Sequence, residues 1–164
     1  MTISPEQWLG LLLVTEARRR SERAAWVPIA WLVRNRAESR RFRPTVEGCV
    51  LQPQQFSKFN DWAAELAEGG PVAVWDAAGR WSKRERGLDA LRAEAEEVAR
   101  VVLEADRATA PFGPLVLHFY SPQSMRPPGS VPGWWFREIA REVPIRGLNP
   151  DAFRFGESHA PGRR

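Results

Sequence analysis

The apolar run from Trp8 to Val14 is followed almost at once by Glu16. On a helix, Trp8, Leu12 and Glu16 are spaced at i, i+4 and i+8, so Glu16 ends a stripe that must be buried. Apolar surroundings disfavour the charged form of a carboxyl group, so its pKa rises. A carboxylic acid that keeps its proton near neutral pH can serve as a general acid. The sequence therefore makes Glu16 a candidate catalytic residue, with solvation or pairing to the arginines that follow it as the alternative.

The length of 164 residues and the 43% hydrophobic and 27% charged fractions predict one globular domain with a sizeable core. We place this domain at residues 1–156 and expect a flexible tail at 157–164. The single cysteine excludes an internal disulfide, and two histidines are too few for a histidine-rich metal site. We therefore expect no metal and no other cofactor. No stretch approaches the roughly 20 apolar residues of a membrane span, and the N-terminus resembles a helix start, so we expect synthesis in the cytoplasm without a signal peptide.

The net charge of +4 and the pI of about 10.2 favour an anionic partner, such as nucleic acid, a membrane surface or an acidic cell-wall polymer. The basic residues are almost all arginine, a bias that high-GC coding or a hot habitat also produces. Arginine clusters at 18–20, 34–43 and 80–86 leave open a non-enzymatic protein that binds nucleic acid or the cell wall, or that assembles in a particle. No helix-turn-helix, zinc-finger or RNP-like string accompanies these clusters, which weakens that alternative.

Helical periodicity predominates along the chain. The expected elements are helices at 5–18, 26–38, 61–68, 83–105 and 134–143 and a strand at 115–120. Pro28 suits the first turn of the second helix, and Asp61 can cap the third, which Gly69 and Gly70 end. These elements predict the α+β class, mainly α, with a small β-sheet or ribbon.

Several short strings keep an order that is typical of one family. They are Glu16-Ala17-Arg18, Arg34-Asn35-Arg36, Phe42-Arg43-Pro44-Thr45-Val46, Gln52-Pro53-Gln54-Gln55-Phe56-Ser57, Ala110-Pro111-Phe112-Gly113-Pro114, His118-Phe119-Tyr120-Ser121-Pro122 and Pro132-Gly133-Trp134. In this order they resemble the cell-wall hydrolase family typified by the spore-cortex-lytic enzyme SleB, over about residues 10–155. The family's E-A-R-G-E string is altered here, because Arg19 replaces its glycine and its second glutamate is displaced to Glu22.

The resemblance implies a lysozyme-like, mainly helical fold and an enzyme that cleaves peptidoglycan between N-acetylmuramic acid and N-acetylglucosamine. It also implies that Glu16 is the catalytic acid. In that chemistry Glu16 protonates the glycosidic oxygen, the acetamido group of the sugar stabilises the cation, and Glu16 then accepts a proton from the sugar's 6-hydroxyl or from water. We expect a lytic transglycosylase, with a muramidase as the alternative, because Asp61 is the sole other nearby carboxylate candidate and is explained as a helix cap.

Five further residues are candidates for holding the substrate. Gln55, Ser57, His118 and Tyr120 carry donors and acceptors suited to acetamido and hydroxyl groups, and Trp134 suits stacking on a sugar ring. Each is also explained by a structural role alone. The expected partner is a peptidoglycan glycan strand, with nonspecific binding to other anionic polymers. We expect a phage or prophage lysin, or a component of a phage particle, that acts on the wall after release.

Overall fold

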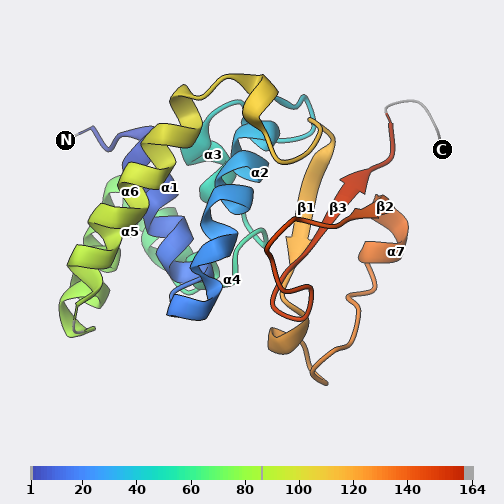
Figure 1. The fold of residues 1–164 in the computed structure, drawn as a ribbon. Helices are drawn as coiled ribbons and strands as arrows, with labels where there is room; N and C mark the ends of the chain where they lie inside the picture. The colour runs from blue at the N-terminus through green and yellow to red at the C-terminus, as the bar shows by residue number, and fades with distance from the viewer. Residues whose placement is uncertain (1, 86, 161–164) are drawn as a thin grey trace.

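The chain folds into a helical part and a small sheet that stand side by side (Figure 1). The computed structural model describes residues 2–85 and 87–160. Its elements are α1 (Pro5–Glu16), η1 (Arg20–Ala25), α2 (Trp26–Glu38), α3 (Val46–Val50), α4 (Ser57–Asn60), α5 (Ala63–Arg84), α6 (Leu88–Glu104), η2 (Arg107–Thr109), β1 (Val116–Tyr120), η3 (Pro122–Ser124), α7 (Trp135–Glu138), β2 (Ile139–Val143) and β3 (Arg154–Ser158), where η marks a 3₁₀ turn. The prediction of an α+β class, mainly α, with a small sheet is confirmed.

Helix α1 is the buried centre of the helical part. Ser4 caps it, because its side chain accepts a hydrogen bond from the Gln7 backbone N–H while the Gln7 side chain accepts one from the Ser4 N–H. Every residue from Trp8 to Val14 is buried, as expected for a helix that is apolar all round. The buried end of this helix carries Glu16 into the body of the molecule.

Gly10 lets α1 and α6 approach closely. A Cβ atom added at Gly10 would lie 2.5 Å from Cγ and 2.9 Å from Cα of Glu96 on α6. The second of these atoms is backbone and cannot move aside without shifting the helix. The contact between the two helices therefore depends on the missing side chain.

We expect Gly10→Ala to lower the free energy of unfolding by about 1–3 kcal/mol, the usual cost of overpacking. Denaturant unfolding followed by circular dichroism measures it. The matched control is Gly79→Ala on α5, because a Cβ atom at Gly79 meets no atom within 4 Å. The control is expected to be neutral or slightly stabilising. Equal stability of the two variants would contradict this account of the α1–α6 contact.

Boundaries of α1, α5 and α6 differ from those predicted. Helix α1 ends at Glu16 and not at Arg18. Helix α5 begins at Ala63, and Gly70, with φ 67°, breaks its helical geometry where the predicted helix ends, so that Pro71 begins a second helical segment. Asp61 is not a helix cap, because its carboxylate instead accepts a hydrogen bond from Lys58 Nζ at 3.0 Å. The following helix, α6, begins later than predicted, after Gly87 with φ 78°.

The sheet is antiparallel with the strand order β1-β3-β2, so the last strand along the chain is the central one. His118 on β1 lies opposite Gly156 on β3. Asn35 fastens α2 to the start of β1, because its amide donates to the carbonyl oxygens of Gly113 and Val116 at 3.1 and 3.0 Å. The sheet is thereby attached to the helix that neighbours α1.

The segment at 134–143 is not one helix, as predicted, but the short helix α7 followed by strand β2. Pairing of residues 139–143 with β3 prevails over the helical pattern. The predicted tail is also corrected at its start, because Ser158 in β3 is 2% exposed and its N–H donates to Leu115 O at 2.8 Å. The tail residues 161–164 lie outside the described residues.

Within residues 2–85 and 87–160, no helix combines the length and hydrophobicity needed to cross a membrane. The same residues contain no group of three or more side chains arranged to bind a metal ion.

Candidate active site

Glu16 is the last residue of α1 and lines an open cavity of about 420 Å³. The other lining residues are Thr15, Arg18, Arg19, Glu22, Gln123, Ser124 and Arg126. They come from the end of α1, from the corner that leads into α2, and from the segment after β1. The corner between α1 and α2 is held by a buried hydrogen bond, because Trp26 Nε1 donates to the carbonyl oxygen of Ala17 at 2.9 Å. Segments more than a hundred positions apart in the sequence therefore meet around one carboxyl group.

The carboxyl group of Glu16 is held in a state that favours its proton. Its Oε1 atom is buried and has no hydrogen-bond partner among the described residues. Burial raises the pKa of Glu16 to about 7, and the positive charge of Arg36 partly opposes this rise. Arg18 pairs with Glu85 at 2.9 Å and not with Glu16. The rise in pKa has the direction predicted from the sequence, and it favours the protonated form near neutral pH.

Arg36 is a buried cation beside this site. Its side chain is 3% exposed, and its Nε donates to Leu117 O at 2.7 Å. The guanidinium lies 4.8 Å from the ring centroid of Phe42 and 5.2 Å from that of Phe56. Its Nη1 atom is buried without a hydrogen-bond partner among the described residues. Arg36 belongs to one of the strings that carry the family resemblance, and the structure brings its charge close enough to act on Glu16.

Glu22 is a second carboxylate in the Glu16 cavity, and sequence reasoning did not select it. Its side chain is 13% exposed. One oxygen accepts a hydrogen bond from the Arg19 N–H at 3.1 Å, and the other accepts one from Gln123 Nε2 at 3.2 Å. The spacing of Arg19 and Glu22 is that of a capping pair, which is the sequence signal that indicates this orientation.

Gln55, His118 and Trp134 lie together in a second cavity of about 330 Å³. The other lining residues are Arg36, Gln54, Phe119 and Glu138. The rings of His118 and Trp134 have centroids 5.6 Å apart. Burial, and then the charges of Arg36 and Arg41, lower the pKa of His118 to about 4. The imidazole is therefore neutral at neutral pH and can both donate and accept a hydrogen bond.

Ser57 and Tyr120 line neither of these two cavities. Ser57 is exposed at the first residue of α4. Tyr120 is 6% exposed, and its ring packs edge-on against Trp135 with centroids 4.8 Å apart. The structure thus brings three of the five predicted substrate-binding residues together and leaves these two apart from them.

The fold and the site define a class: a lysozyme-like protein in which a largely buried carboxylic acid lines a cavity. The fold is similar to that of the catalytic domain of the germination-specific lytic transglycosylase SleB from Bacillus anthracis, with a TM-score of 0.52 and 14% sequence identity. The similarity covers 96% of this chain and 97% of that one.

Residues 21–144 match the family model of the cell wall hydrolases, and the chain belongs to that family. The resemblance to SleB-like cell-wall hydrolases seen in the sequence is thereby confirmed. The matched residues begin after Glu16, so the role of Glu16 is argued from its geometry. No curated protein sequence matches the chain.

Proposed function

We propose that this protein degrades peptidoglycan as a lytic transglycosylase that cleaves between N-acetylmuramic acid and N-acetylglucosamine. The observation that carries the proposal is the carboxyl group of Glu16, which is buried, lacks a hydrogen-bond partner at Oε1 among the described residues, and has its pKa raised to about 7. Membership in the cell wall hydrolase family supports the substrate. The similar solved structure is that of a lytic transglycosylase, which supports the reaction type.

Glu16 serves as both acid and base in this proposal. Its protonated carboxyl group gives a proton to the glycosidic oxygen as the bond to the muramic acid C1 breaks. The acetamido group of the muramic acid stabilises the resulting cation. The carboxylate of Glu16 then takes the proton of the 6-hydroxyl, whose oxygen bonds to C1 and closes the 1,6-anhydro ring. The proton returns to Glu16, so the enzyme ends the cycle in the state in which it began.

Arg36 stabilises the intermediate state in which Glu16 has lost its proton. Its charge favours the carboxylate form of Glu16, and burial keeps that charge little screened. The second cavity supplies groups suited to a sugar ring and its acetamido and hydroxyl substituents: the amide of Gln55, the neutral imidazole of His118 and the indole ring of Trp134.

A muramidase is the second candidate function, and Glu22 is the observation that favours it, because a hydrolase of the two-carboxylate kind requires a partner for Glu16 in the same cavity. We favour the transglycosylase because each oxygen of Glu22 already accepts a hydrogen bond from the corner or from Gln123. Those bonds give the carboxylate a structural role.

Mass spectrometry of fragments released from purified peptidoglycan tests the proposal. Fragments ending in 1,6-anhydromuramic acid are expected, and they should persist at reduced or parental levels in Glu22→Gln. Reducing muramic acid ends from the parent, together with loss of activity in Glu22→Gln, would establish the muramidase. Fragments cleaved only in the peptides would refute both.

We expect Asp61→Asn to keep activity within about twofold of the parent, the scale of an exposed surface change. Asp61 lines neither cavity, and its side chain is 62% exposed and paired with Lys58. The measurement is the rate of fragment release from purified walls. A loss approaching that of a missing catalytic group would place Asp61 in the reaction and overturn the single-acid scheme.

A further inference from the structure

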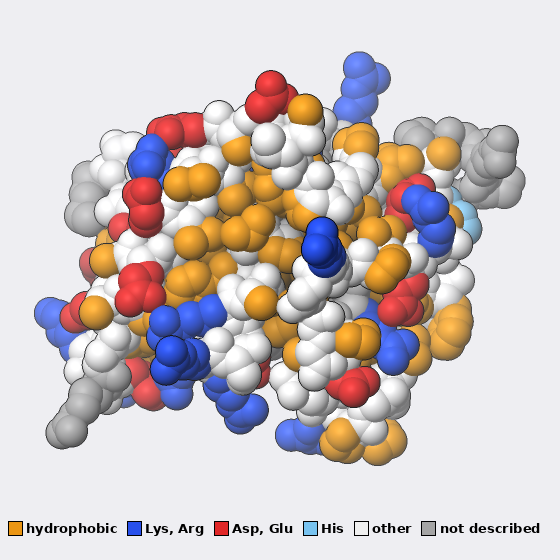
Figure 2. Space-filling model, in the orientation of Figure 1, with side chains coloured by type: hydrophobic (Ala, Val, Ile, Leu, Met, Phe, Trp, Pro, Cys, Tyr) orange, Lys and Arg blue, Asp and Glu red, His pale blue; other side chains and the backbone are white. Residues whose placement is uncertain are grey.

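The Glu16 cavity carries an excess of positive charge that the proposed acid–base chemistry does not use. Three of its lining side chains are arginines, namely Arg18, Arg19 and Arg126, and Glu22 is the sole lining carboxyl group besides Glu16. Figure 2 shows Lys and Arg side chains gathered at the lower end of the helical part, where α1 ends and η1 begins. The charge that acts on Glu16 is that of Arg36, so these arginines are left without a role in the acid–base chemistry.

Arg126 reaches the cavity from a closed loop. The Gly129 N–H donates to Pro122 O at 2.9 Å, and the Ser130 N–H donates to Pro127 O at 3.1 Å, so the backbone around Arg126 is held in place. The Arg126 side chain is exposed, and its hydrogen bond goes to the carbonyl oxygen of its own neighbour, Met125, at 3.2 Å. Within the described part of the chain no carboxylate pairs with it.

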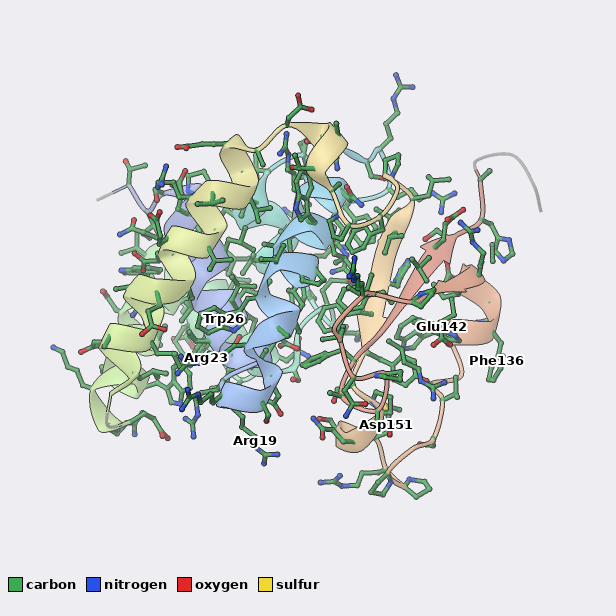
Figure 3. The ribbon with its side chains drawn as sticks, in the orientation of Figure 1. Arg19, Arg23, Trp26, Phe136, Glu142 and Asp151 are labelled. Carbon is green, nitrogen blue, oxygen red and sulfur yellow. The ribbon has the colours of Figure 1, made fainter. Side chains whose placement is uncertain are left out.

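Arg19 lines the same cavity. Its side chain is 78% exposed and projects from the corner below α2 (Figure 3). Its Nη1 lies 3.9 Å from Glu22 Oε1, at the outer limit of an ion pair. Arg18, in contrast, is engaged by Glu85 at 2.9 Å. Arg19 and Arg126 therefore both keep donors available in one cavity.

We propose that this cavity is a subsite for a carboxylate of the substrate, bound by Arg126 with Arg19. The proposal rests on the proposed function and specifies its substrate: a glycan whose muramic acid carries a negative charge is preferred over a neutral one. A guanidinium binds a carboxylate through two parallel hydrogen bonds, which gives both affinity and orientation. The position beside Glu16 is adjacent to the cleaved bond. The carboxylate belongs either to the lactyl group of muramic acid or to the stem peptide attached there.

Three soluble glycans of equal length test the subsite. The first carries the free lactyl carboxylate, the second carries the stem peptide, and the third carries the lactyl group as its neutral methylamide. The parent is expected to cleave one or both charged glycans with a kcat/KM about tenfold above that of the methylamide, the scale of one charge-assisted hydrogen bond. Arg126→Gln is expected to reduce this ratio to near one, and Arg19→Gln to reduce it in part.

Arg40→Gln is the matched control. It removes the same charge from another exposed arginine, beyond the opposite end of α2, and is expected to leave the ratio unchanged. A ratio that falls for the free lactyl glycan alone identifies the lactyl carboxylate as the ligand. A fall for the stem-bearing glycan alone identifies a peptide carboxylate.

Different results would overturn the carboxylate subsite and the proposed function. Equal kcat/KM of the parent on all three glycans, or an equal effect of Arg126→Gln and Arg40→Gln, overturns the subsite while the proposed function stands. Failure of the parent to cleave any of the three glycans, when it also releases no fragments from walls, overturns the proposed function and the subsite with it.

Discussion

Glu16→Gln is expected to lower the rate of wall cleavage by about 10²-fold or more, the contribution of a positioned general acid. Glutamine keeps the size of the side chain, so the buried end of α1 remains filled while the transferable proton is lost. The measurement is the release of soluble glycan fragments from purified peptidoglycan under conditions where the parent gives a linear rate. Thermal unfolding of the variant accompanies it, because a lost rate has meaning only when the fold is intact.

Glu6→Gln is the matched control for this experiment. Glu6 lies in the first turn of the same helix, at the end opposite to Glu16, and lines neither cavity. The same chemical change there is expected to leave cleavage at the parental rate. Activity of Glu16→Gln near that of the parent would remove Glu16 from the mechanism and return the search for an acid to Glu22.

The dependence of kcat/KM on pH should show a descending limb with a midpoint near pH 7. The acid must be protonated to act, and burial has raised the pKa of Glu16 to about 7, so activity is full below that pH and lost above it. Each pH unit above the midpoint removes about nine tenths of the protonated form, so the rate at pH 9 is expected to be about 10²-fold below its plateau. A soluble glycan is the appropriate substrate, since adsorption to whole walls also changes with pH.

The residual activity of Glu16→Gln provides the control for the pH dependence, because it is expected to lack this limb. A parental profile that stays level from pH 6 to pH 9, or that rises, would show that Glu16 does not supply the proton. The circular dichroism of the protein at each pH excludes unfolding as the cause of a decline.

Local signals in the sequence were sufficient for the elements nearest the acid. The capping residue Ser4 and the unbroken apolar run define α1, and the β-branched and aromatic residues of β1 define its strand. The boundaries of α2 are also those predicted from its pattern. The predictions fail where pairing with a distant segment decides whether a stretch forms a helix or a strand. The strand β2 exists because β3 pairs with it, and a single-sequence pattern does not show that partner.

In the candidate site, too, residues in local motifs could be predicted, whereas residues positioned by distant contacts could not. The motif strings that carry the family resemblance contain Gln55, His118 and Trp134, which the fold gathers in one cavity. The local spacing indicates that Glu22 can accept a hydrogen bond from the Arg19 N–H. It does not indicate that Gln123, more than a hundred positions away, binds the other oxygen and places Glu22 in the Glu16 cavity. The burial of Arg36 follows from packing of α2 against the sheet, which has no signature in the local sequence.

The strand order of the sheet has a consequence for when the enzyme can become active. The helical part, with Glu16, precedes the sheet along the chain, and the central strand β3 follows both β1 and β2. Until it emerges, β1 and β2 have no common neighbour, and His118 has no strand opposite it. A growing chain therefore carries Glu16 before its three strands can pair. A chain that stops before β3 is expected to keep the helices but to lack the strand that joins β1 to β2.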